Sequence, residues 1–233
     1  MKTKNGLWKL SPSGLYSYTE CKACFWLENH HRKPPMLPLA LNTAMDSILK
    51  TRYDKYRADK KFPPESKELE KMGIRTFDDL ELLNEWRTNS SALKVVNENS
   101  GYELVGKIDD VFVESDGRFI PADYKSSGNA PAEDKQKYYR DQLAAYGYMF
   151  LKNGYKPSDR AFLLHYFVKD KNDPSTEVKF ASHVDEVKID AKNFEKKLKE
   201  MVDFLEKPYP GDDLECKKCD YYAGRNEKKI RIK

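Results

Sequence analysis

The stretch that decides the fold is Gly-Lys-Ile-Asp at residues 106–109, followed along the chain by Asp-Tyr-Lys at residues 123–125. The residues around these two motifs, 102–114 and 118–125, are rich in apolar and β-branched side chains, which predicts two strands. Between them lies Asp116-Gly117, a pair typical of a hairpin turn. The sequence therefore predicts a β-hairpin that carries two carboxylates and a lysine.

The length of the hairpin loop decides whether the two carboxylates meet. Side chains alternate between the faces of a strand, so Asp123 and Lys125 share one face. A three-residue loop, with Gly117 in the left-handed conformation, places Asp109 directly opposite Asp123. A two-residue loop would place Tyr124 there and would put the carboxylates on different faces. We therefore predict the three-residue loop or an equivalent bulge.

Two carboxylates on one face can hold a divalent cation. With the backbone carbonyl of Tyr124, Asp109 and Asp123 would bind one or two Mg²⁺ or Mn²⁺ ions and activate a water against a phosphodiester. Lys125 would orient that water or stabilise the developing charge. The alternative is a surface hairpin with ordinary acidic residues. Because Asp is depleted in strands, two inward-facing Asp residues near the middle of paired strands favour the functional interpretation.

The segment 135–155 has helical periodicity, and it contains a second polar pair. Gln142 and Tyr146 are four residues apart, so they lie on one helix face. Their amide and hydroxyl groups could bracket a substrate phosphate or orient Lys125. Taken alone, such a pair occurs in many helices, and Tyr146 could equally belong to the core.

The order Gly-x-x-Asp, Asp-x-Lys, Gln-x-x-x-Tyr resembles the PD-(D/E)XK nuclease superfamily. It is most similar to the RecB-like branch, which includes the CRISPR-associated adaptation nucleases and AddB-type nuclease domains. The resemblance implies a restriction-endonuclease-like α/β fold, a mixed central sheet flanked by helices. It also implies that Asp109 and Asp123 bind the metal, that Lys125 is catalytic, and that Gln142 and Tyr146 form the downstream helix motif.

The resemblance implies a function as well: a metal-dependent deoxyribonuclease, more an exonuclease than an endonuclease. Its substrate would be DNA, single-stranded or with free ends, and its partner a helicase or a CRISPR adaptation complex, in DNA repair or CRISPR adaptation. The alternative is a catalytically inactive nucleic-acid-binding subunit with the same fold.

One departure from the branch concerns its first long helix, which usually carries a metal-binding His. Residues 43–59 are predicted to form that helix, and Asp46 stands where the His would be. An Asp could ligate a hard cation, or it could be a solvated helix residue. We retain Asp46 as a candidate metal ligand.

Four cysteines form the second constellation, as a Cys-x-x-Cys pair near each end of the sequence: Cys21, Cys24, Cys216 and Cys219. Two such knuckles suit a tetrahedral zinc ion, and four thiolates also suit an iron–sulfur cluster. The local spacing favours zinc. The family resemblance implies a 4Fe–4S cluster, with Cys24 replacing a third C-terminal cysteine, because its members usually have one cysteine near the start and three near the end. We therefore expect a 4Fe–4S cluster, with zinc as the alternative. In both cases the metal would join the two ends of the chain, and the alternative is free or disulfide-bonded thiols.

Composition limits the remaining possibilities. The 233 residues carry a net charge of +4 and 34% charged residues, so any nucleic acid would meet local basic patches. Candidate patches are residues 30–33 and 228–233. The apolar stretches are too short to span a membrane, and no secretory signal follows Met1. We therefore expect no membrane partner, a cytoplasmic location and reduced thiols.

We expect one PD-(D/E)XK-like domain over residues 1–233. It would have a helical portion at about 11–97, a catalytic core at about 98–206 and a cysteine segment at 207–233. Further elements are predicted by periodicity; these are helices at 11–30, 77–97 and 192–206 and strands at 161–169 and 176–189. His165, in the middle of a predicted strand, is interpreted as structural and left out of the site.

Overall fold

The computed structural model describes residues 1–31, 39–132, 136–172, 177–216 and 218–219. Its helices and 3-10 turns are η1 (Pro12–Gly14), α1 (Tyr16–Glu20), α2 (Lys22–His30), α3 (Ala40–Arg57), η2 (Pro64–Ser66), α4 (Glu68–Lys71), α5 (Leu80–Thr88), α6 (Gln136–Lys152) and α7 (Phe194–Leu205). Its strands are β1 (Trp8–Leu10), β2 (Arg75–Thr76), β3 (Val95–Asn97), β4 (Tyr102–Leu104), β5 (Asp110–Val113), β6 (Phe119–Ser127), β7 (Arg160–Val168) and β8 (Phe180–Lys188).

The strands form two mixed sheets. The larger has the order β2-β5-β6-β7-β8, in which β6 and β7 are parallel and the other neighbours are antiparallel. The smaller has the order β1-β4-β3, with β1 parallel to β4. The parallel β6–β7 step is made by α6, which connects the two strands as a crossover helix does in a βαβ unit. The predicted mixed α/β fold is therefore present.

The hairpin between β5 and β6 has the predicted register. Asp110 pairs with Ala122 and Val113 with Phe119, so the same register places Asp109 opposite Asp123. The loop closes with the N–H of Gly117 donating to the carbonyl of Glu114 at 3.0 Å, and Gly117 has a φ of 88°. Only glycine adopts that conformation without strain. The three-residue loop is thus observed.

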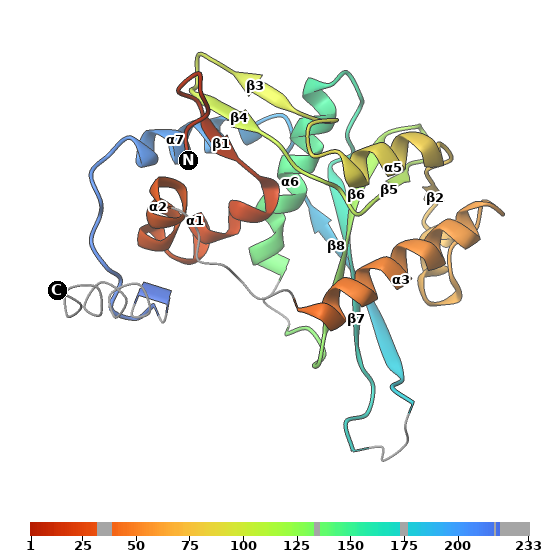
Figure 1. Ribbon diagram of the computed structural model, residues 1–233. Coiled ribbons are helices and arrows are strands. Elements are labelled where there is room, and N and C mark those ends of the chain that lie inside the picture. The colour runs from red at the N-terminus through yellow and green to blue at the C-terminus, as the bar shows by residue number, and fades with distance from the viewer. Residues whose placement is uncertain (32–38, 133–135, 173–176, 217, 220–233) are drawn as a thin grey trace.

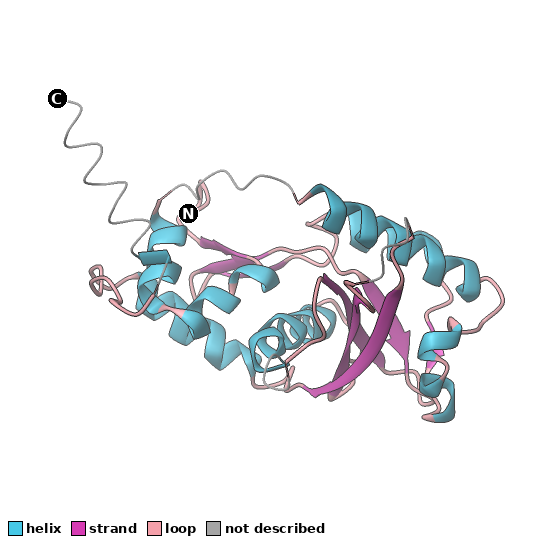
Figure 2. Ribbon diagram, turned by 90° about the horizontal axis from the view of Figure 1, so that it is seen from below, coloured by secondary structure: helices cyan, strands magenta, loops and turns pink. Residues whose placement is uncertain are grey.

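Each face of the large sheet packs against its own helix (Figures 1 and 2). Side chains of α3 cover one face; the buried cluster there is Met45, Leu49, Tyr53, Phe112, Ile120, Ala122, Tyr124, Phe162, Leu164 and Tyr166, with others from the loops. The opposite face packs against α6 and belongs to a larger cluster that extends to α7 and the small sheet. Because side chains alternate, Asp123 and Lys125 lie on the α6 face and Tyr124 on the α3 face.

The predicted strand over 102–114 is two strands joined by an irregular segment. β4 belongs to the small sheet and β5 to the large one, so residues 105–109 pass between sheets. The backbone N–H groups of Val105, Gly106 and Ile108 donate outside the hairpin, to Leu10, Ser90 and Trp86 respectively. Gly106 packs so closely that an added Cβ would lie 2.7 Å from the ring of Pro12. The close packing at this position therefore explains why the motif has a glycine at residue 106.

Two predicted helices are also broken. The helix expected over 11–30 is η1, α1 and α2, because Cys21 is extended (φ −156°, ψ 115°) and its sulfur accepts the N–H of Cys24 at the start of α2. The helix expected over 77–97 ends with α5 at Thr88, and its last residues form β3 instead. Local periodicity was the signal in both cases, and contacts with distant residues overrode it.

Among the helices of the described ranges, none is both long and apolar enough to cross a membrane.

Candidate active site and four-cysteine site

The two predicted carboxylates meet at the α6 face of the large sheet. Asp109 accepts a hydrogen bond from the backbone N–H of Tyr124 at 3.2 Å, which ties it to β6 beside Asp123. Asp123 is only 2% exposed. One of its oxygens accepts from the Gln142 amide at 2.7 Å, and the other forms an ion pair with Lys125. The hairpin and α6 thus bring Asp109, Asp123, Lys125 and Gln142 to one place.

Burial dominates the electrostatics of Asp123. Loss of water raises the pKa of its carboxyl to about 7; Lys125 opposes the rise and Asp109 adds to it. For Lys125, burial works to lower the pKa, but the two carboxylates outweigh it, and the pKa lies above its ordinary value. The Lys125 ammonium also lies 4.6 Å from the centre of the Tyr139 ring. The site is therefore a buried, strongly coupled set of charges.

Gln142 and Tyr146, both on α6, contact residues that form the site. Gln142 lies 3.5 Å from the hydroxyl of Tyr146, and that hydroxyl donates to the carbonyl of Lys107 at 2.6 Å. Lys107 belongs to the Gly-x-x-Asp motif. In this structure Gln142 and Tyr146 therefore contact Asp123 and the motif backbone, not the Lys125 ammonium that the sequence suggested as one partner.

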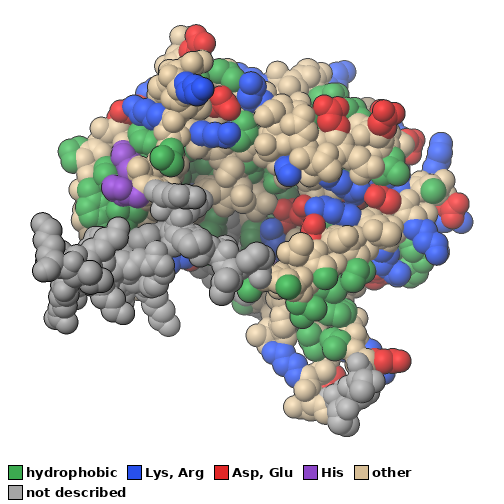
Figure 3. Space-filling view, viewed as in Figure 1, with side chains coloured by type: hydrophobic (Ala, Val, Ile, Leu, Met, Phe, Trp, Pro, Cys, Tyr) green, Lys and Arg blue, Asp and Glu red, His purple; other side chains and the backbone are tan. Residues whose placement is uncertain are grey.

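Among the residues that the structure describes, a lysine links Asp46 to Asp109. The Asp46 carboxylate lies 2.8 Å from the Nζ of Lys50, one turn further along α3. That Nζ lies 3.0 Å from Oδ1 of Asp109, whose Oδ2 accepts the N–H of Tyr124. Lys50 was missed at the sequence level, because an i,i+4 Asp-Lys pair is a common feature of solvated helices. Acidic and basic side chains lie together at the centre of the face shown in Figure 3, beside the region of α3.

Behind the site lies a buried ionic network that sequence reasoning also missed. Asp110 is fully buried and pairs with Arg57 of α3 and, at 3.4 Å, with Arg87 of α5. Arg87 also donates to the carbonyl of Asp109 at 2.7 Å and to the carboxylate of Asp54 at 2.7 Å. In the sequence, the only indication of this network is that Asp110 follows Asp109 and therefore lies on the opposite face of the strand.

The residues present fit a divalent cation. Asp109 and Asp123 offer oxygen ligands, which Mg²⁺ and Mn²⁺ prefer. The buried Oδ2 of Asp123 has no hydrogen-bond partner of normal geometry among the described residues, although Lys125 pairs with it. The ion pair with Lys125 offsets only part of the cost of burying this oxygen, and a bound metal cation would offset more of it.

The four cysteines converge although they come from opposite ends of the chain. Their sulfur atoms all lie within 4.8 Å of one another, and three pairs are 3.6–3.7 Å apart. With Zn–S bonds of about 2.3 Å, a tetrahedral ion sets sulfurs about 3.8 Å apart. In a 4Fe–4S cluster each thiolate binds a different iron, so its sulfurs lie farther apart. The four-cysteine group can hold a metal, and its spacing fits a single ion.

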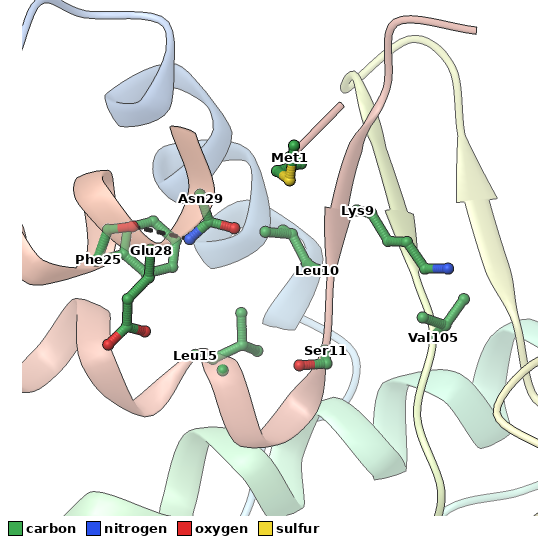
Figure 4. Close-up of a pocket in the computed structure, with 10 residues that line it drawn as sticks. Met1, Lys9, Leu10, Ser11, Leu15, Phe25, Glu28, Asn29 and Val105 are labelled. Atoms are coloured by element: carbon green, nitrogen blue, oxygen red, sulfur yellow. Dashed lines mark hydrogen bonds between the residues drawn. The ribbon is translucent and has the colours of Figure 1, made fainter. Parts of the chain in front are cut away.

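A separate cavity of about 220 Å³ lies between β1, η1 and α2 (Figure 4). Its one carboxylate, Glu28, accepts a hydrogen bond from Ser17 at 2.8 Å. In Figure 4 the amide of Asn29 donates to the carbonyl of Phe25 at 2.8 Å. The cavity shares no residue with the carboxylate site.

The predicted basic patches lie largely outside the described residues. This applies to 228–233 and to residues 32–33 of the first patch. In the first patch, residues 30–33, the ring of His30 stacks on the ring of Trp26, with ring centres 3.6 Å apart. His165 pairs with Asp185 at 3.0 Å, one strand away from Lys125.

Comparison with known proteins places the chain in a family. A model of the PD-(D/E)XK nuclease superfamily matches residues 9–223. The chain therefore belongs to the PD-(D/E)XK nuclease superfamily, whose members act on nucleic acid and use divalent metals. A solved structure described as "Crystal structure of SSO0001" is similar, with 13% identity, 89% of this chain and 79% of that chain covered, and a TM-score of 0.39. No curated protein matches.

Proposed function

We propose that this protein is a metal-dependent deoxyribonuclease that hydrolyses phosphodiester bonds at the site of Asp109, Asp123 and Lys125. The observation that carries the proposal is the convergence of both carboxylates and the lysine on one sheet face, with Gln142 bonded to Asp123. A surface hairpin with ordinary acidic residues would not bury Asp123 to 2% exposure against a lysine.

The residues of the site have separate roles in this proposal. Asp109, Asp123 and the carbonyl of Tyr124 would hold Mg²⁺ or Mn²⁺, which supplies an acidified water and neutralises charge on the phosphate. Gln142 keeps one oxygen of Asp123 in position, and Tyr146 holds the carbonyl of Lys107. Lys125 directs its ammonium into the site, where it orients the attacking water or stabilises the developing negative charge.

The proposal extends to an exonuclease of the RecB-like branch, acting on DNA with free ends beside a helicase or a CRISPR adaptation complex. The order of the three sequence motifs supports the branch. Because an exonuclease needs an end, the enzyme should degrade linear DNA and spare a closed circle.

The decisive assay measures cleavage of end-labelled single- and double-stranded DNA and of a closed circle, with Mg²⁺, with Mn²⁺ and without either. Wild-type protein should degrade the linear substrates only with the metal, and Asp123→Ala and Lys125→Ala should lower the rate by at least about 100-fold. Asp116→Ala, at the exposed tip of the same hairpin, is the matched control and should keep full activity. Cleavage that persists in a folded Asp123→Ala variant would remove the assignment.

A second candidate is a nuclease-fold subunit that binds nucleic acid without cleaving it. The observation in its favour is the Lys50 ammonium, which already pairs with Asp109. Such a subunit would bind DNA equally well with and without Mg²⁺ and would give no products in the same assay.

For the four cysteines we propose a structural zinc ion, the alternative being a 4Fe–4S cluster. The sulfur distances of 3.6–3.7 Å support one shared ion. Elemental analysis of protein purified without oxygen should show one zinc per chain and no visible absorption band. Four irons per chain with a brown colour would instead establish the cluster.

A further inference from the structure

Lys50 occupies a position that the nuclease proposal leaves without a role. Its Nζ lies 3.0 Å from Asp109 Oδ1 and 2.8 Å from Asp46 Oδ2, and its side chain is 23% exposed. The other oxygen of Asp109 accepts the N–H of Tyr124. Both oxygens of the first predicted metal ligand therefore have partners, and one partner is a cation carried by the protein.

Asp46 positions this lysine. The two residues are one helical turn apart on α3, with the acid on the N-terminal side, the order that favours an i,i+4 ion pair. Asp46 is 41% exposed at its side chain, whereas Lys50 points inward to Asp109. The carboxylate at residue 46 thus holds the ammonium between itself and Asp109.

The charges at the site limit how many ions it can take. Asp46, Asp109 and Asp123 face the ammonium groups of Lys50 and Lys125, while Asp110 is already paired with Arg57 and Arg87 on the other strand face. Three carboxylates against two ammonium groups leave one negative charge. A single divalent ion makes the site positive, and a second would lie against the Lys50 ammonium, where like charges repel each other.

We propose that Lys50 takes the place of a second metal ion, so that the site binds one divalent cation and the protein supplies the other positive charge. The proposal rests on the proposed function, because it takes Asp109 and Asp123 as the metal ligands. In this arrangement Lys50 is a positioning residue that acts through Asp109, and Asp46 is its anchor.

The test counts metal ions without DNA. Mn²⁺ is titrated into the protein by calorimetry, and the bound ions are examined by electron paramagnetic resonance, in which two neighbouring Mn²⁺ ions show spin coupling. Sites elsewhere on the chain are counted with Asp109→Asn/Asp123→Asn and subtracted. Wild type should bind one ion at the site, without coupling. Lys50→Met, similar in length but uncharged, should bind two coupled ions, and Lys50→Arg should return to one.

Lys55→Met, an exposed lysine on the same helix, is the matched control and should behave as wild type. Lys50→Gln provides a second neutral variant, and thermal melting identifies any variant that does not fold. Two ions in wild type, or one ion in both neutral Lys50 variants, would overturn the role of Lys50 and leave the nuclease proposal intact. If wild-type protein binds no Mn²⁺ at the site, both the role of Lys50 and the nuclease proposal are overturned.

Discussion

At the scale of single residues, the burial of Asp123 destabilises the folded state. A carboxylate that is 2% exposed loses almost all its hydration, and one ion pair with Lys125 and one amide hydrogen bond offset that loss only in part. A cation bound to Asp123, as proposed above, would offset more of that loss. The stability of the metal-free protein should therefore report on this one side chain.

The first prediction concerns pH. The folded-state pKa of Asp123, about 7, lies above its ordinary value, so the folded state holds a proton that the unfolded state releases. Stability is then lost as pH rises from about 4 to about 7, by on the order of 2–4 kcal/mol. Urea unfolding without Mg²⁺ or Mn²⁺ should show this loss in wild type and not in Asp123→Asn.

Asp116→Asn is the control for that experiment. The pKa of Asp116 is lowered by its hydrogen bond with the Arg118 side chain, so its contribution has the opposite sign. A wild-type protein as stable at pH 8 as at pH 5, relative to Asp123→Asn, would contradict the prediction.

The second prediction concerns the motif glycine. An alanine Cβ at residue 106 would lie 2.7 Å from the buried ring of Pro12, so Gly106→Ala must push apart η1 and the segment that carries Asp109. We expect a loss of about 1–3 kcal/mol in the free energy of unfolding. Gly128→Ala, where the nearest atom is a lysine Nζ at 4.0 Å, should be tolerated. Equal unfolding midpoints in urea for the two variants would count against the packing argument.

At the scale of secondary-structure elements, the hairpin register was predictable because two local rules agree. The Asp-Gly turn sets the loop length, and the period of two along a strand sets the faces. The breaks at Cys21 and at residues 105–109 were not predictable. At residues 105–109 the backbone gives up local hydrogen bonds for partners far along the chain, such as the carbonyls of Leu10 and Trp86. At Cys21 the backbone keeps its local hydrogen bonds, and the distant contact is made by the sulfur, which lies 3.6 Å from that of Cys219.

The third prediction concerns the attachment of α5 to the site. Arg87 donates to the Asp109 carbonyl and shares the buried Asp110 with Arg57. Arg87→Met leaves that carbonyl and part of Asp110 without partners, so we expect a loss of about 3 kcal/mol or more by urea unfolding. Arg75→Met, which breaks an exposed 3.6 Å pair with Asp78, should change stability by less than about 1 kcal/mol. Similar effects from both variants would contradict the buried-network interpretation.

At the scale of the whole molecule, the four cysteines join segments that are remote in sequence. Cys21 and Cys24 flank the start of α2, whereas Cys216 and Cys219 follow α7, and the four sulfurs form one buried or half-buried group. Phe204 of α7 packs on Phe25 of α2, with ring centres 6.4 Å apart, so the four-cysteine group extends an existing contact between the two segments. A bound metal there should stabilise the folded state against the unfolded chain.

The fourth prediction follows from that linkage. Removing one thiolate disrupts the whole tetrahedral site, so Cys219→Ser should lower the melting temperature by on the order of 5–10 °C. Cys21→Ser/Cys219→Ser should lower it no further. Lys218→Met, which loses only an exposed pair with Glu20, is the neighbouring control. Additive losses from the two serine substitutions would indicate separate packing effects without a shared metal.

The sequence by itself determined the hairpin register, because the register depends on the turn and on alternation along strands. The order of its motifs, through their resemblance to a nuclease superfamily, indicated the class of fold and the five residues of the proposed active site. The sequence also predicted that the two cysteine pairs would meet. Only the tertiary structure decided that Lys50 lies on Asp109, that Asp110 is paired with Arg57 and Arg87, and that the cysteine sulfurs lie at single-ion spacing. Those features depend on how α3, α5 and the chain ends pack around the sheet, and no local periodicity encodes contacts between side chains so far apart in sequence.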